Sequence, residues 1–151
     1  MDQLTKEYKA LVRGSWRLFN LSQRAWSKAF LELGLSSTTF PMVELAVQNP
    51  GISQQEIADM LSVDKSCVSR AVKQLVDNGF LQREKSAEFS HGFGCFPTEK
   101  SLQAYERVIE LESTHIRALF SDVEISRLRD ANGFLVELNT RLQSQTSDGQ
   151  K

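Results

Sequence analysis

The chain has 151 residues, of which 40% are hydrophobic and 25% are charged, and its formal net charge is −1. This composition indicates one folded domain and excludes a disordered or low-complexity chain. No apolar run approaches the roughly 20 residues that a membrane-spanning helix needs, and the N-terminal MDQLTKEYKA lacks the apolar core of a signal peptide, so we expect a cytoplasmic protein with no membrane partner.

The first predicted element is one long helix over residues 4–33. Apolar side chains recur in it every seven residues in two adjacent series, Leu4, Leu11, Leu18 and Ala25, and Val12, Phe19, Trp26 and Leu33. This spacing gives a continuous apolar stripe on one face. An ordinary core helix would show the same spacing, but so small a domain cannot cover so long a stripe. We therefore favour a subunit interface.

A helix-turn-helix is predicted after a short supporting helix that begins near Pro41. Ser53 and Glu56 have the spacing of a capping box, which begins the first helix of the pair, and Asp64 can cap the second. The pair Asn78-Gly79 suits the end of that second helix. Its inner face is an apolar stripe of Val68, Val72, Leu75 and Val76.

The outer face of that second helix is short, polar and basic, which suits a DNA major groove. It carries Lys65, Ser66, Cys67, Ser69, Arg70 and Lys73. A strand from Phe80, a polar loop over 86–91 and a returning strand over 92–96 follow, which is the pattern of a β-hairpin. The predicted fold is therefore mainly α with a small antiparallel wing, a winged helix-turn-helix over residues 38–97.

The C-terminal part is predicted to be helical again. Thr98 begins a helix that runs to about Phe120, and the spacing of Ser121 and Glu124 indicates a second capping box before a final helix. In that helix leucines again repeat every seven residues, and the polar tail 143–151 is expected to fray. Long striped helices over 4–33 and 98–143 thus flank the winged unit in a single domain of residues 1–151, which favours a two-fold homodimer.

Positive charge is confined to a small part of the predicted DNA-binding unit. Residues 36–97 hold five basic and seven acidic side chains, whereas residues 1–35 hold six basic and three acidic ones. Only the face with Lys65, Arg70 and Lys73 concentrates positive charge in the winged unit. Non-specific affinity for DNA is therefore expected to be modest and sensitive to salt.

The order of elements and the motif residues resemble the MarR family of bacterial transcriptional regulators over nearly the whole chain. The most specific part is ISQQEIADMLSVDKSCVSRAVKQLVDNGFLQRE followed by PTEKS. The family's serine or threonine positions fall on Ser66, Cys67 and Ser69, and its arginine falls on Arg70. The resemblance implies a homodimer that binds a pseudo-palindromic operator in double-stranded DNA, generally as a repressor, with relief by a small molecule or an oxidant.

The wing departs from that pattern. The family commonly carries an acidic residue followed by arginines there, and equal spacing places Phe89, Ser90 and His91 at those positions. The arginine that the resemblance would send into the minor groove is missing. His91 is a poor replacement, because it is neutral much of the time near pH 7.

Each candidate DNA contact has a role that follows from its chemistry. Arg70 can bond guanine O6 and N7 together, Ser66 and Ser69 can reach phosphate or a base edge, and Lys65 and Lys73 suit phosphate. Weaker phosphate candidates are Ser53 and Gln54 at a helix start and Arg83 and Lys85 at the base of the wing. A solvated helix face would have the same composition, but its place between a tight turn and a hairpin favours DNA.

Two further sites are weaker hypotheses. The resemblance places an effector pocket between the terminal helices and the winged unit, where Trp16, Arg17, Phe40 and His115 could meet a small aromatic or anionic molecule, although aromatic stripes are usually core. Cys67 and Cys95 are most simply read as small residues, and a redox switch is the alternative. We expect no catalytic site, metal or cofactor, because the sequence has no metal-spaced Cys/His cluster, glycine-rich loop or nucleophile elbow.

A second class of function remains open from the sequence. The acidic balance of residues 36–97 and the altered wing would also suit a dimeric adaptor that keeps the fold and binds a protein or a small molecule in place of DNA.

Overall fold

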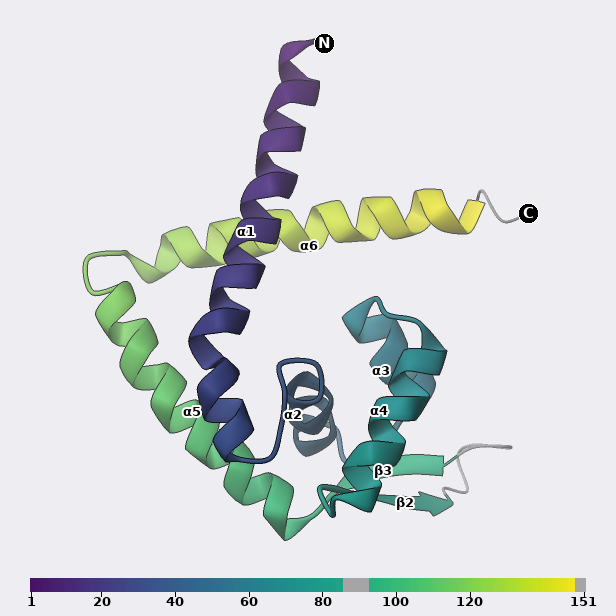
Figure 1. The fold of residues 1–151 in the computed structure, drawn as a ribbon. Helices are drawn as coiled ribbons and strands as arrows, with labels where there is room; N and C mark the ends of the chain where they lie inside the picture. Colours follow the sequence, from purple (N-terminus) through teal and green to yellow (C-terminus); the bar gives the residue numbers. More distant parts are fainter. Residues whose placement is uncertain (86–92, 149–151) are drawn as a thin grey trace. The chain divides into compact units, whose positions relative to one another are not determined.

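The computed structural model describes residues 1–85 and 93–148, and over these ranges the chain forms six helices and three short strands (Figure 1). The helices are α1 (Gln3–Glu32), α2 (Phe40–Gln48), α3 (Gln54–Leu61), α4 (Lys65–Asp77), α5 (Glu99–Leu119) and α6 (Ile125–Asp148). The strands are β1 (Ile52–Ser53), β2 (Leu81–Lys85) and β3 (Phe93–Pro97). This arrangement confirms the predicted mainly α fold with a small antiparallel wing.

The chain divides into two compact units, Met1–Glu110 and Leu111–Lys151, with the boundary inside α5. The first unit contains α1 to α4, the sheet and the first half of α5. The second contains the end of α5 and all of α6. No helix among the described residues is long and apolar enough to cross a membrane.

The core of the first unit lies between α2, α3, α4 and the sheet. The apolar stripe predicted for α4 is buried there, since Val68 and Val72 are 0% exposed and Leu75 is 2% exposed. The same core takes in side chains from the end of α1 and from the first half of α5: Phe30, Ala104 and Val108. Residues 4–21 of α1 are different, because most of their apolar side chains are exposed in the single chain, with Leu18 66% and Phe19 55% exposed.

The predicted helix boundaries in this unit hold closely. The N-terminal helix begins at Gln3, where the Asp2 carboxylate accepts hydrogen bonds from the Thr5 amide and hydroxyl, which lower the pKa of Asp2. The capping box of α3 is confirmed. Helix α4 ends at Asp77, directly before the predicted stop at Asn78 and Gly79, and the φ of Gly79 is +75°. The cap at the start of α4 differs from the prediction. Asp64 occupies the N-cap position, but its carboxylate makes no bond to the helix.

The sheet has one strand more than the sequence predicted. Its order is β1-β3-β2, and β3 lies between the other two in antiparallel register, with Ile52 opposite Cys95 and Arg83 opposite the same residue on the other side. Strand β1 escaped prediction because it has only two residues and directly precedes the capping box, whose first member, Ser53, it contains. The extra strand ties the wing to the start of α3.

Gly94 makes this pairing possible. A Cβ built on Gly94 would lie 2.7 Å from the Gly51 carbonyl oxygen and 3.1 Å from Gly51 Cα, so only glycine lets β3 approach this turn so closely. Gly51 itself has φ +92°, which glycine adopts readily, and its N–H donates to the Cys95 carbonyl at 2.9 Å. The Phe96 ring lies against the same turn. The base of the wing is therefore held by backbone contact.

In the second unit, both predicted ends of the last helix differ from the structure. The predicted capping box over Ser121 and Glu124 is not the start of the last helix, because α6 begins at Ile125. Instead, the Ser126 hydroxyl bonds the Glu124 carboxylate at 3.3 Å. At the other end α6 continues to Asp148, past the end at 143 that the polar sequence suggested. Its apolar side chains, among them Phe134, Leu135 and Leu142, are exposed in the single chain.

We expect Gly94→Ala to lower the free energy of unfolding by about 1–3 kcal/mol, because the new methyl group would push β3 away from the Gly51 turn. Chemical denaturation followed by circular dichroism measures this change. Gly14→Ala is the matched control, since nothing lies within 4 Å of a Cβ at that helical position and alanine should stabilise the helix by up to about 1 kcal/mol. Equal effects at both positions would contradict the close approach.

Candidate nucleic-acid interface

The outward face of α4 is polar and carries three of the five basic side chains of residues 36–97. All six side chains predicted to form it are exposed: Lys65, Ser66, Cys67, Ser69, Arg70 and Lys73. Their positions recur at helical spacing opposite the buried stripe, so the helix presents one wet face and one apolar face. The structure therefore brings the predicted recognition residues together on one element.

Arg70 lies at the middle of this face and is held only loosely. Its Nε donates to the Ser66 carbonyl at 3.4 Å, and one terminal nitrogen lies 3.5 Å from Cys67 Sγ. The first contact is long for a hydrogen bond to oxygen, and the second goes to a thiol, which is a weak acceptor, so little free energy is lost when the guanidinium turns to another partner. Lys73 forms an ion pair with Asp77 at 3.7 Å, and this pair is weak because both side chains are exposed to solvent.

The start of α3 is less suited to phosphate than the sequence implied. The Ser53 hydroxyl accepts from the Glu56 amide at 3.1 Å, and the Glu56 carboxylate accepts from the Ser53 amide at 2.8 Å, which lowers the pKa of Glu56. A carboxylate thus already takes the favourable position at this helix N-terminus. A phosphate close to Ser53 or Gln54 would have to approach that negative charge.

The base of the wing offers two cations on one strand. Arg83 and Lys85 are exposed on β2 and are two residues apart, so they point to the same side of the sheet. His91 and the two residues before it, Phe89 and Ser90, lie outside the described residues.

The two cysteines have different environments. Cys67 is exposed on α4, whereas Cys95 is fully buried in β3, and this burial raises the pKa of the Cys95 thiol despite the opposing charge of Arg83. A buried neutral thiol is a poor nucleophile, because the thiolate is the reactive form. The structure thus gives Cys95 a packing role in the sheet.

We predict that iodoacetamide will alkylate Cys67 and spare Cys95 in the folded protein, because only Cys67 is open to the reagent. Mass spectrometry of the peptides, with labelling in denaturant as the reference, measures the two rates. In a Cys67→Ser variant the folded protein should take up almost no label. Rapid labelling of Cys95 without denaturant would contradict its burial.

The residues predicted for an effector pocket lie in different settings. Phe40 is a core residue, only 3% exposed, and its ring stacks on Phe30 with centroids 4.8 Å apart and on Tyr105 at 6.5 Å. Trp16 is 69% exposed on α1, with its ring 6.3 Å from that of Phe19, and Arg17 is exposed beside it. His115 belongs to the second unit, on an exposed part of α5.

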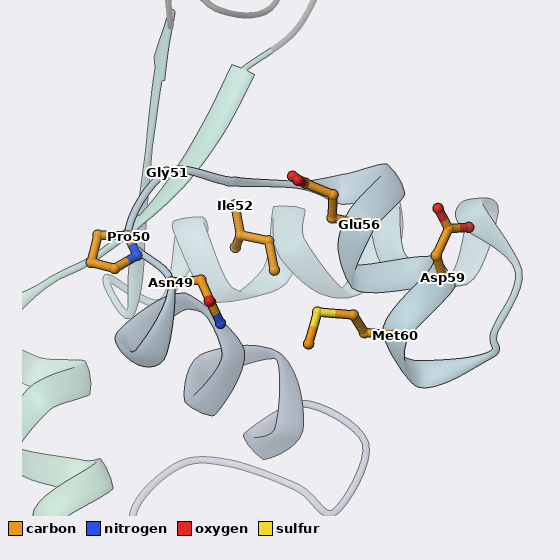
Figure 2. A pocket seen from close by; sticks show the side chains of 7 residues that line it. All are labelled: Asn49, Pro50, Gly51, Ile52, Glu56, Asp59 and Met60. Carbon is orange, nitrogen blue, oxygen red and sulfur yellow. The ribbon is translucent and has the colours of Figure 1, made fainter. Parts of the chain in front are cut away.

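A hollow of about 380 Å³ opens elsewhere, between the end of α2 and the outer side of α3 (Figure 2). It is lined by Asn49, Pro50, Gly51, Ile52, Glu56, Asp59 and Met60. None of these residues was predicted as a ligand contact. Its charged groups are the carboxylates of Glu56 and Asp59, bonded to Ser53 and to Gln55, so the hollow does not fit the anionic effector expected from the sequence.

Comparison with known proteins places this geometry in a family context. The model of the MarR family matches residues 35–88. The HTH-type transcriptional regulator YybA of Bacillus subtilis (strain 168) is 33% identical over 105 residues, which cover 70% of this chain and 65% of that protein, just under two thirds of its length. A protein of Thauera aromatica named as transcriptional regulatory for the hcr operon is 31% identical over 117 residues, covering 76% of this chain and 67% of that protein.

Solved structures share the fold. A MarR family regulator of Listeria monocytogenes, solved in complex with a 26mer DNA, superposes with a TM-score of 0.70 at 21% identity, covering 96% of this chain and 92% of that chain. At this identity the likeness shows the fold.

Proposed function

This chain belongs to the MarR family of transcriptional regulators, and on that premise we propose that it regulates transcription by binding double-stranded DNA at a pseudo-palindromic operator. The observation that carries the proposal is the exposed polar face of α4, which lies beside the wing and opposite the buried side chains of Val68, Val72 and Leu75. The DNA complex of the Listeria monocytogenes structure supports this use of the fold.

In this proposal the contacts divide by chemistry. Arg70 reads a guanine, because its planar fork matches the O6 and N7 acceptors of that base and its present contacts within α4 are weak. Ser66 and Ser69 reach a base edge or phosphate, with Cys67 beside them. Lys65 and Lys73 contact phosphate, and Arg83 and Lys85 add phosphate contacts from the base of the wing. Ser53 and Gln54 contribute least, because the carboxylate of Glu56 occupies the helix start.

We expect Arg70→Ala to reduce the preference for the operator over random DNA by about 1–3 kcal/mol, because a bidentate base contact is lost. Selection from a random library gives the operator, and fluorescence anisotropy on selected and scrambled duplexes then measures the preference. Lys73→Ala is the matched control. It should weaken binding to both duplexes alike and lower the salt dependence by about one unit of slope. Unchanged discrimination in Arg70→Ala would remove the base-reading role.

We further propose that the protein is a homodimer joined through its terminal helices. Apolar side chains are exposed at helical spacing along both of them: Leu4, Val12, Leu18 and Phe19 on α1, and Leu128, Leu135 and Leu142 on α6. Exposed apolar surface of this extent marks an interaction site. A two-fold dimer would present two α4 helices to the two half-sites of an operator.

The double variant Leu18→Glu/Phe19→Glu should shift the protein toward monomers, because it places two carboxylates in the apolar stripe of α1. Analytical ultracentrifugation over a range of concentrations measures the change. Arg13→Glu is the matched control, since it alters the net charge by the same amount on the side of the helix away from the stripe. A wild-type protein that sediments as a monomer at all concentrations would contradict the dimer.

The proposal includes repression that a small aromatic or anionic molecule relieves. Trp16 offers an exposed ring and Arg17 an exposed positive charge on α1, and His115 is a third candidate contact. Phe40 is the weakest of the four, because its ring is enclosed between Phe30 and Tyr105. Ligand-dependent release of operator DNA, lost in Arg17→Ala, would support this part.

A second candidate function has a specific observation in its favour. Residues 36–97 carry a net negative charge, and Phe89, Ser90 and His91 stand where the family commonly carries an acidic residue followed by arginines, which would suit an adaptor that binds a protein or a small molecule. A gel shift against random-sequence DNA at low salt separates the two. Retained DNA at micromolar protein supports the regulator, and its absence supports the adaptor.

A further inference from the structure

The end of α4 and the start of α5 are bound together by a compact set of contacts. The Thr98 hydroxyl donates to the Gly79 carbonyl at 2.7 Å, the Thr98 amide donates to the Phe80 carbonyl at 3.2 Å, and Lys100 Nζ donates to the Asn78 carbonyl at 2.9 Å. These five residues are called the α4–α5 joint below. The three successive carbonyls that follow Asp77, the last residue of α4, thus accept hydrogen bonds from Thr98 and Lys100 at the start of α5.

The same Thr98 also begins α5. Its hydroxyl accepts from the Ser101 amide at 3.3 Å, and the Ser101 hydroxyl, which is fully buried, donates to the Thr98 carbonyl at 2.8 Å and accepts from the Thr98 amide at 2.8 Å. One side chain therefore caps α5 and grips the end of α4. A displacement of either helix relative to the other would break both functions together.

Phe80 links a third element to this joint. Its ring is 1% exposed and lies under the Lys100 ammonium group, with Nζ 4.2 Å from the ring centroid. The edge of the same ring faces the turn after α1. A Cβ built on Gly34 in that turn would lie 3.9 Å from Phe80 Cε2 and Cζ, which is ordinary van der Waals contact. The end of α1, the end of α4 and the start of α5 thus meet around one aromatic ring.

We propose that Lys100 is a positioning residue for DNA recognition, which fixes the direction of α4 through the α4–α5 joint without touching DNA itself. This inference rests on the proposed function and adds a means of regulation to it. Helix α1 carries one of the exposed stripes and the candidate effector residues Trp16 and Arg17, and α5 carries His115. A ligand or subunit that shifts either helix would move the end of α4 through this joint.

The charge and the length of the Lys100 side chain are both needed. The carbonyls at the C-terminal end of a helix carry partial negative charge, so a cation bound there gains from the helix dipole and from the hydrogen bond. Methionine keeps the apolar stem over the Phe80 ring and loses the cation, whereas arginine keeps a donor and a cation. The pair Lys100→Met and Lys100→Arg therefore separates the ionic contact from packing.

Two measurements test the proposal. Anisotropy on selected and scrambled duplexes should show roughly a three- to tenfold loss of discrimination in Lys100→Met with an unchanged salt slope, and recovery in Lys100→Arg. Arg107→Met is the control, because it removes a cation from the same helix whose partner is the exposed Glu110. Hydrogen exchange of the DNA-free protein should show faster exchange at residues 76–80 in Lys100→Met alone.

Each contrary result overturns the inference. A salt slope lower by about one would make Lys100 a phosphate contact, unchanged discrimination would make it a surface residue, and an equal loss in Arg107→Met would make the effect one of net charge. If the wild-type protein selects no DNA, the proposed function fails, and hydrogen exchange alone decides on the joint. Unchanged exchange at residues 76–80 would then overturn it.

Discussion

The burial of one face of α4 is the constraint on which the rest of this structure depends. Val68, Val72 and Leu75 are almost completely enclosed, and burying side chains of this size contributes about 1.5–3 kcal/mol each. Rotating α4 to hide its polar face would expose this stripe and bury Arg70 and Lys73 without partners, which costs far more. The helix therefore has one rotational setting, and its basic residues face outward whether or not a ligand is present. What remains adjustable is the direction of the helix axis, and the contacts at its two ends determine that.

Those two ends are held very differently. At the N-terminal end, the Asp64 carboxylate makes no bond to the helix, and the preceding turn passes through Ser62 in the left-handed region. At the C-terminal end, Thr98 and Lys100 bind three carbonyls. The side-chain hydrogen bonds that hold the end of α4 to another helix thus lie at its C-terminal end.

Local signals in the sequence predicted most of the fold and the most basic face. The capping box, the stop at Gly79 and the stripe of α4 each depend on residues a few positions apart, and all three agree with the structure. What the sequence missed depends on contacts between distant segments. Strand β1 pairs with β3 because Gly94 lets β3 approach Gly51, forty-odd residues away in the sequence. A strand of two residues is too short to show an alternating pattern from which it could be predicted. The sequence left Phe40 open between core packing and an effector pocket, and its stacking on Phe30 and Tyr105, far along the chain, gives it a place in the core. Ser121 and Glu124 had the spacing of a capping box, yet α6 starts one residue after the second of them.

The charge distribution decides how such a surface can recognise DNA. Phosphate contacts supply most of the non-specific affinity, and the salt-dependent part of that affinity comes from cations near the backbone. Residues 36–97 offer only five cations against seven acids, and the carboxylate of Glu56 already stabilises the start of α3. With so few cations for phosphate contacts, the proposed DNA binding would depend on base contacts and on the pairing of two half-sites in the proposed dimer. Both are geometric demands, since a bidentate arginine contact is lost within about an ångström of misplacement. A DNA-binding protein with few basic residues must therefore position its recognition helix more accurately than a strongly basic one. In this chain the contacts around Phe80 are placed to fix the position of α4.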